Sequence, residues 1–167
     1  MTPLGVGIFL SLLGDATLYT VLPDPSIAAQ AGLSVGMVGV LLGANRLVRI
    51  LTNTPAGILY DRMPRRMLMI LSLLLGTFST MTYAIGEGLA FLLAGRILWG
   101  IAWSGIWVGA NTMALDLSGT ENRGRVNGYL QMWFFLGVAC SSFLGGLFTD
   151  LFGFRDGLWV STGLSAL

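Results

Sequence analysis

Residues 57–86 read GILYDRMPRRMLMILSLLLGTFSTMTYAIG, and this stretch decides the fold. One acidic and three basic residues crowd its first ten positions, whereas residues 67–86 carry no charged side chain. A bilayer core about 30 Å thick requires roughly 20 mostly apolar residues per helix. The stretch therefore predicts a basic loop at a membrane surface, followed directly by a transmembrane helix.

The composition of the whole chain agrees with a polytopic membrane protein. Of its 167 residues, 54% are hydrophobic and 10% are charged, against roughly 25% charged in an average soluble domain. The 24 glycines favour helices that pack closely in lipid. A net charge of +1 excludes the basic field that nucleic-acid binding requires. Because the chain has no His and a single Cys, Cys140, we expect no metal site with nitrogen or sulfur ligands and no cofactor.

Five apolar stretches are long enough to cross a bilayer. They lie at about 4–22, 36–59, 67–86, 89–115 and 126–149. A sixth stretch begins near Gly157, after a turn at residues 153–156, and its eleven residues span only roughly 16 Å as a helix. We therefore expect an all-α transmembrane bundle with five complete spans and an incomplete sixth. Such a chain is either a fragment of a longer protein or an incomplete protein.

The arginines outside the spans predict the orientation of the chain. Cytoplasmic loops collect basic residues, and five loop arginines lie on one side of the predicted bundle against one on the other. We therefore expect a cytoplasmic N-terminus in an integral membrane protein, most simply of the plasma membrane. The five are Arg62, Arg65, Arg66, Arg123 and Arg125, and the one is Arg155.

Four ionisable residues fall inside the spans: Asp15, Arg46, Arg49 and Arg96. Each costs at least about 2.5–3.5 kcal/mol at the bilayer centre, so we expect them to face a shared interior. Asp15 and Arg49 lie at a similar depth, roughly 15–16 Å from the cytoplasmic ends of their helices. We hypothesise that Asp15 pairs with Arg49 or Arg46 and titrates when the cavity changes access. The alternative is a permanently ionised structural salt bridge between the first two helices.

Two further patterns follow the helical period. Trp99, Trp103 and Trp107 recur every four residues, and Asn111 follows at the same spacing, so they form one stripe on the fourth span. The stripe either lines a cavity for aromatic or cationic ligands or packs against protein and lipid. Glycines at similar spacing predict close helix packing. They are Gly32, Gly36, Gly39 and Gly43 before and within the second span, and Gly105 and Gly109 in the fourth.

The residues from Gly57 to Arg66 resemble the G-x-L-a-D-R-x-G-R-R signature of the major facilitator superfamily, with Pro64 in place of the second Gly. The first span has Leu13-Gly14 and, five residues later, Thr20-Val21-Leu22-Pro23, which is similar to l-g-x5-P-v-x-P with Thr20 replacing a Pro. The fourth span has Arg96-Ile97-Leu98-Trp99-Gly100, which is similar to R-x-x-q-G.

The fifth span resembles the antiporter motif g-x-x-x-G-P-x-x-G-G of the same family. Its counterpart residues are Gly137, Ser141, Ser142, Gly145 and Gly146, with the two serines in the places of the central Gly-Pro. The final Gly153-Phe154-Arg155 resembles the G-W-R that precedes the sixth helix in this family.

The resemblance covers nearly the whole chain and implies the N-terminal six-helix half-domain, residues 1–167, of a twelve-helix transporter whose C-terminal half is absent here. It implies alternating access around a central site. Arg96 would be the family's buried fourth-helix arginine, associated with proton coupling, and Asp15 a proton site. The alternative for Arg96 is snorkelling or a bond to the first helix. A cytoplasmic gating latch against the C-terminal half would contain Gly57, Asp61, Arg62, Arg65 and Arg66.

These patterns predict one half of a proton-coupled exporter of small organic molecules. An uptake carrier of the same family is the alternative within transport. The alternative outside transport is a truncated membrane fragment that acts only by pairing with another half. The expected partners are the lipid bilayer, a small-molecule substrate, the proton, and the missing C-terminal half or a second half-transporter. We do not expect an enzyme, because the spans hold neither paired carboxylates nor a nucleophile with its base.

Overall fold

The computed structural model describes residues 2–86 and 88–166, and the regular structure in these ranges is entirely α-helical. Five of the helices are long and apolar enough to cross a membrane, which confirms the five predicted spans and the all-α fold class. Helices α2 and α7 are shorter. The elements are α1 Thr2–Val21, α2 Pro25–Gln30, α3 Val35–Arg62, α4 Arg65–Ile85, α5 Gly88–Asp116, α6 Arg123–Phe152 and α7 Phe154–Ser165.

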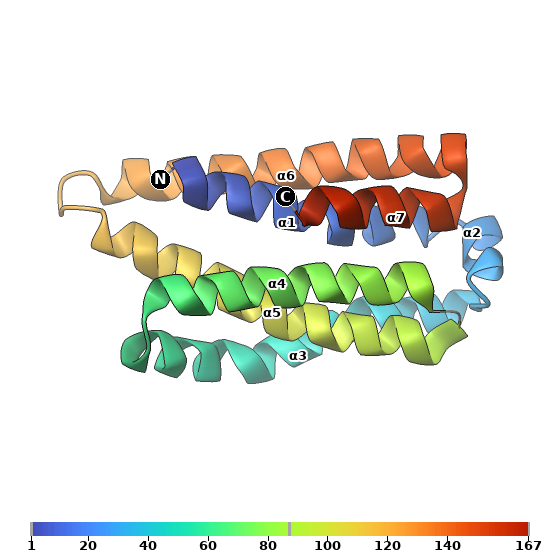
Figure 1. Ribbon diagram of the computed structural model, residues 1–167, viewed down its shortest axis with the longest axis horizontal. Coiled ribbons are helices and arrows are strands. Elements are labelled where there is room, and N and C mark those ends of the chain that lie inside the picture. Colours follow the sequence, from blue (N-terminus) through green and yellow to red (C-terminus); the bar gives the residue numbers. More distant parts are fainter. Residues whose placement is uncertain (1, 87, 167) are drawn as a thin grey trace.

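The long helices run side by side along the longest axis of the molecule (Figure 1). Helix α1 packs chiefly on α6, and α5 packs on both α3 and α4. Helix α7 lies against α1, α4 and α6. The bundle therefore consists of an α1–α6 layer and an α3–α4–α5 layer, and α1 and α5 face each other across them.

The short helix α2 was not predicted, although its signal is present in the sequence. Asp24 is its N-cap, and the Asp24 carboxylate accepts hydrogen bonds from the Ser26 backbone N–H at 2.8 Å and from the Ser26 hydroxyl at 2.6 Å. Pro25 occupies the first helical turn, where its missing N–H is not needed. The Asp-Pro-Ser sequence thus starts a helix inside what we expected to be a loop.

The predicted start of the sixth span is wrong by three residues. Helix α7 begins at Phe154 rather than near Gly157, because the break after α6 is confined to Gly153, whose φ is +87°. Glycine reaches that conformation without the strain of a Cβ. Asp156 then lies in the first turn of α7, where a carboxylate is favourable near the positive end of the helix dipole. The twelve residues of α7 extend about 18 Å.

Glycines on α5 allow its close contact with the neighbouring helices. An added Cβ at Gly105 would collide with Ser72 of α4, and one at Gly109 would collide with Tyr60 of α3. The packing role predicted for these two glycines is therefore confirmed. Gly36, Gly39 and Gly43 of α3 make no such contact within the described structure, where an added Cβ would meet nothing within 4 Å, so packing at these three glycines stays a prediction.

Buried apolar side chains form two clusters at opposite ends of the bundle. The first, which we call the α2-end core, includes Leu18 and Leu22 of α1 with Leu92 of α5. The second, the tryptophan-end core, includes Ile8 and Leu12 of α1 with Trp99, Trp103 and Ile106 of α5. Along both α1 and α5, the gap between the two clusters falls at a charged residue.

The α1–α6 contact predicts opposite effects for two glycines of α6. A Cβ at Gly137 would lie 3.1 Å from the Phe9 Cα and 2.9 Å from a Leu12 methyl, whereas a Cβ at Gly146 would meet nothing within 4 Å. Gly137→Ala should therefore destabilise the protein by about 1–3 kcal/mol through overpacking. Gly146→Ala should stabilise it by about 0.5–1 kcal/mol through helix propensity. Unfolding in mixed micelles measures both, and equal shifts would contradict this packing.

The N-cap of α2 predicts that the stability of this short helix depends on pH. The hydrogen bonds from Ser26 hold the pKa of the Asp24 carboxyl below its ordinary value. The cap therefore stabilises α2 above the ordinary carboxyl pKa, and this stabilisation is lost as the pH falls through the lowered pKa. Ser26→Ala should raise the pKa of Asp24 toward its ordinary value, as measured by the carboxyl ¹³C shift. Ser34→Ala, which removes the cap of α3 instead, should leave it unchanged.

Candidate functional site

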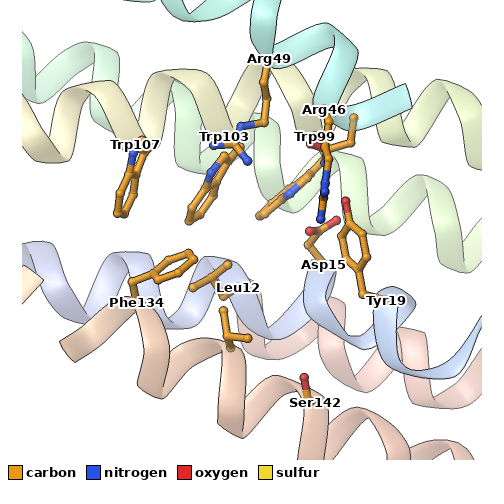
Figure 2. Close-up of a pocket in the computed structure, with 12 residues that line it drawn as sticks. Leu12, Asp15, Tyr19, Arg46, Arg49, Trp99, Trp103, Trp107, Phe134 and Ser142 are labelled. Carbon is orange, nitrogen blue, oxygen red and sulfur yellow. The ribbon is translucent and has the colours of Figure 1, made fainter. Parts of the chain in front are cut away.

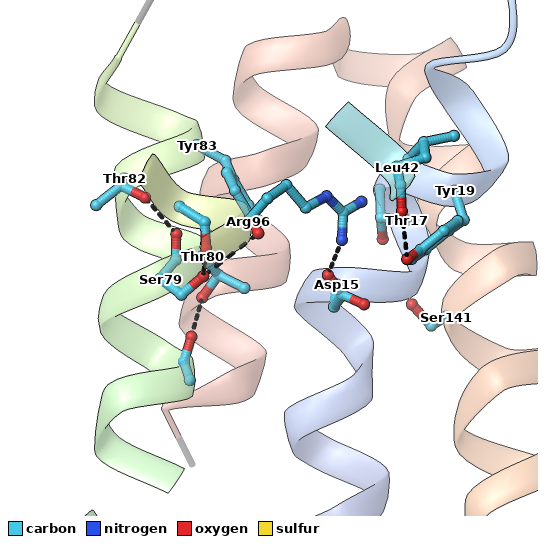
Figure 3. Close-up of polar contacts among 12 residues, drawn as sticks. Asp15, Thr17, Tyr19, Leu42, Ser79, Thr80, Thr82, Tyr83, Arg96 and Ser141 are labelled. Carbon is cyan, nitrogen blue, oxygen red and sulfur yellow. Dashed lines mark hydrogen bonds and ion pairs between the residues drawn. The ribbon is translucent and has the colours of Figure 1, made fainter. Parts of the chain in front are cut away.

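A buried ion pair joins α1 to α5 between the two apolar cores. The Arg96 Nη1 donates to the Asp15 Oδ1, and the side chains are 0% and 7% exposed (Figure 3). This contact corrects the predicted pairing of Asp15 with Arg46 or Arg49. It agrees with the alternative for Arg96, a bond to the first helix. Two charges in an apolar interior satisfy each other here, and neither is tolerated alone.

Aromatic rings enclose the rest of the Arg96 guanidinium. Its Cζ lies 4.5 Å from the centroid of the Tyr19 ring and 5.5 Å from that of the Tyr83 ring, which favours the cation. The Arg96 Nε and Nη2 have no hydrogen-bond partner among the described residues. Ser79 donates at 2.7 Å to the Gly95 carbonyl and lies 3.3 Å from the Tyr83 hydroxyl. Arg96 thus relies on one carboxylate and two ring faces.

A cavity of about 380 Å³ opens beside the ion pair. It lies between α1, α3, α5 and α6, with Asp15 at one end and the tryptophans of α5 along one wall (Figure 2). Its volume is within the range of small-molecule sites. The lining residues are Leu12, Asp15, Tyr19, Asn45, Arg46, Arg49, Trp99, Trp103, Trp107, Phe134, Val138 and Ser142.

The tryptophans of α5 form a stacked row. The ring centroids of Trp99 and Trp103 are 5.9 Å apart with planes at 24°, and those of Trp103 and Trp107 are 5.9 Å apart at 16°. Phe134 of α6 contacts the row from the other side, 5.2 Å from the Trp107 centroid. The Arg49 guanidinium lies 5.9 Å from the Trp103 centroid. The row forms an aromatic wall with a cation beside it.

Most of the predicted pathway residues meet at this cavity. Asp15, Arg46, Arg49, Trp103 and Trp107 line it, while Arg96 lies behind Asp15, fully buried. Asn111 does not line the cavity: its amide Nδ2 donates at 2.7 Å to the Trp107 carbonyl of its own helix. The four-residue spacing therefore predicts the cavity wall correctly as far as Trp107, but not at Asn111.

Sequence reasoning missed five of the residues that line the cavity, and three of these five have polar or aromatic side chains. Tyr19 follows Asp15 by one helical turn, a spacing that places both on one face and so was available as a signal. Asn45, only 3% exposed, directly precedes Arg46. Phe134 lies in an apolar run of α6, and nothing in its spacing separates it from the lipid-facing residues around it.

The antiporter-like motif of α6 is divided between packing and the cavity. Gly137 and Gly145 face α1, where added Cβ atoms would meet Leu12 and Thr17 respectively. Ser141 lies between them and donates at 3.0 Å to the Leu13 carbonyl. Ser142 lines the cavity instead, and Gly146 faces open space. One face of the motif therefore holds α6 against α1.

The predicted basic loop is mostly helical: Gly57, Asp61 and Arg62 belong to the end of α3, and Arg65 and Arg66 to the first turn of α4, so only residues 63 and 64 connect the two helices. This motif lies at the opposite end of the bundle from α2 (Figure 1). Arg65 forms an ion pair with Asp116 at the end of α5, with both side chains well exposed. Asp61, Arg62 and Arg66 are also exposed, and an added Cβ at Gly57 would meet nothing within 4 Å. One member of the predicted latch therefore contacts its own half, and the others are at the surface.

The two ion pairs should contribute very differently to stability. Asp15→Asn or Arg96→Gln leaves a buried charge unpaired and should destabilise the protein by about 3–5 kcal/mol. The double variant should be more stable than the sum of the two single effects predicts, because the second change removes that unpaired charge. The matched exposed pair, Arg65→Gln and Asp116→Asn, should cost about 1 kcal/mol or less. Unfolding of all variants in micelles measures this, and strictly additive effects at Asp15 and Arg96 would contradict the pairing.

Comparison with known proteins agrees with this geometry. The chain is 24% identical over 151 residues to Multidrug resistance protein 1 of Bacillus subtilis (strain 168), covering 90% of this chain and 38% of that protein. It is 23% identical over 144 residues to Quinolone resistance protein NorA of Staphylococcus aureus, covering 86% of this chain and 37% of that protein.

The chain thus spans less than two fifths of the length of these curated relatives. The matched part lies in their N-terminal halves. The family model described as Major Facilitator Superfamily matches residues 4–167, which is nearly the whole chain. With its membrane-spanning helices, its charged motif where α3 meets α4 and its buried arginine in α5, this integral membrane protein belongs to the major facilitator superfamily.

Proposed function

We propose that the chain is the N-terminal half of a secondary transporter that moves a small organic solute by alternating access. One observation carries the proposal: a buried ion pair forms the end of an aromatic cavity of small-molecule size. Ionisable groups at membrane depth are costly and mark solute or proton pathways. The cavity between α1, α3, α5 and α6 is partly open, and the C-terminal half, or a second copy of this half, would close it.

Asp15 is the proposed proton site. It lines the cavity, so a proton reaches it from there, and its partner Arg96 is fully buried. Protonation would remove one charge of the pair and leave Arg96 unpaired in an apolar interior, which is costly. The α1–α5 contact would then be weaker in the protonated state than in the ionised state. A difference of this kind between two states is what a conformational switch requires.

The charged α3–α4 turn, formed by the end of α3 and the start of α4, is the proposed cytoplasmic gate. Asp61, Arg62 and Arg66 are exposed at the end of the bundle that carries most loop arginines. Arg65 already forms an ion pair with Asp116, so it would hold the α3–α4 turn in place. The exposed residues of the motif would contact the other half. The same arginine distribution supports a cytoplasmic N-terminus, and the plasma membrane is the proposed location.

Efflux in exchange for protons is the proposed direction, supported by similarity to relatives named for multidrug and quinolone resistance. Uptake together with a proton is the second candidate, and the free charge of the cavity favours it. Arg46 and Arg49 line the cavity, and neither forms an ion pair with a described residue. Protonation of Asp15 would leave the positive charge of Arg96 without a counter-charge, which would make the cavity more positive. An anionic solute and a proton would then strengthen each other's binding.

The decisive experiment is solute flux in vesicles that contain the protein expressed from its native gene, with an imposed pH gradient and a panel of fluorescent dyes and metabolites. A gradient should drive net flux. Asp15→Asn should abolish gradient-driven flux while solute exchange without a gradient persists, because exchange requires no proton release. Asp15→Glu should keep the coupling with a displaced pH profile.

Asp150→Asn is the matched control, because Asp150 is an exposed carboxylate near the end of α6, and it should behave as the parent. Unchanged proton dependence in Asp15→Asn would exclude Asp15 as the proton site. Absence of any flux or exchange would favour the non-transporting fragment. Solute affinity measured at two pH values then separates the directions: it should fall at low pH for exchange and rise for cotransport.

A further inference from the structure

We propose that the cavity selects planar aromatic anions, with the negative group held by Arg46 and Arg49 and the ring held against the tryptophan row. The inference rests on the proposed function in one respect: it takes this cavity as the solute site and adds the chemical class of the solute. It is carried by two features of the cavity, the sign of its uncancelled charge and the shape of its α5 wall.

The uncancelled charge of the cavity is positive. Asp15 is the carboxylate among its lining residues, and Arg96 already neutralises it. Arg46 and Arg49, one turn apart on α3, form no ion pair with any residue that the structure describes, so two positive charges remain. The buried Nε of Arg49 also has no hydrogen-bond partner there. A cationic ligand would have to compete with Arg96 for Asp15, whereas an anion meets two available guanidinium groups.

The arginines are placed to act together with the aromatic wall. The Arg49 guanidinium lies over Trp103 at 5.9 Å, and Arg46 lies beside Trp99 at the Asp15 end of the row (Figure 2). A guanidinium stacks through its face while its N–H groups donate from its edge, so an arginine over a ring still binds a carboxylate. The anion site and the ring site are therefore adjacent.

The shape of the wall favours a flat ligand. Trp103 and Trp107 are stacked with only 16° between their planes, and Phe134 stands 5.9 Å and 5.2 Å from them. A planar ring gains offset or edge contacts with such rings beyond its apolar burial. Asn45 and Ser142 add polar groups to the lining. A volume of about 380 Å³ suits a fused two-ring or three-ring molecule.

The test compares matched ligands on the full chain in nanodiscs of uncharged phosphatidylcholine, by equilibrium dialysis corrected with empty nanodiscs. The ligands are 2-naphthoate, 2-naphthylmethylammonium and cyclohexanecarboxylate. 2-Naphthoate should bind roughly tenfold or more tightly than the ammonium, since hydrogen bonds between charged groups contribute about 1.5–3 kcal/mol. It should also bind more tightly than the non-aromatic carboxylate.

Variants assign the preference to particular residues. Arg46→Gln with Arg49→Gln should abolish the preference for 2-naphthoate over the ammonium, whereas Arg46→Lys with Arg49→Lys should retain a preference for the anion. Trp103→Leu should weaken binding of 2-naphthoate while leaving cyclohexanecarboxylate nearly unchanged. Arg123→Gln with Arg125→Gln, at exposed positions at the start of α6, is the charge-matched control and should bind as the parent.

Equal or tighter binding of the ammonium, or no saturable binding of 2-naphthoate, would overturn the inference. So would a preference that survives removal of both arginines. Binding is measured without a gradient, so its result is independent of the flux experiment. Specific naphthoate binding without any flux would remove the proposed function and leave this inference. Proton-driven flux of cations without naphthoate binding would do the reverse.

Discussion

The contact between Asp15 and Arg96 is the constraint on which the arrangement of the bundle depends. It joins α1 to α5, and therefore the α1–α6 layer to the α3–α4–α5 layer. The apolar cores on either side of it require no particular partner, but a buried charge does, because its desolvation is offset only by an opposite charge in good geometry. Any movement between the two layers must keep this pair or neutralise it.

Small residues on α5 and α6 allow the close helix contacts on either side of the Asp15–Arg96 pair. Gly137 and Gly145 of α6 bring α1 close on one side, and Gly105 and Gly109 of α5 do the same for α4 and α3. Where α1 and α5 face each other, bulky rings replace the glycines, and the cavity opens beside Asp15. The protein thus packs tightly within each layer and leaves its space between them, where a solute and a proton would meet the same pair of helices.

The pairing of Asp15 shows what depth along a helix predicts and what it does not. Counting residues predicted that Asp15 lies deep in the membrane and must be paired, yet Arg49 at similar predicted depth is not its partner. Arg96 is its partner, because α1 and α5 face each other across the two layers while α3 packs mainly on α5. Residue counts give height in the bilayer, whereas the choice of partner depends on how each helix is rotated and which helices adjoin.

Hydrophobic periodicity and length by themselves determined the class, the five spans and the stripe of tryptophans, because in lipid each helix must satisfy its own backbone and its apolar length must match the bilayer. Only the tertiary structure decided which charges meet, that Phe134 of α6 completes the aromatic wall, that Asn111 bonds to its own helix instead, and that the glycines of α3 pack on nothing described. Those outcomes depend on contacts between helices distant in sequence, and a repeat along one helix contains no information about its neighbours.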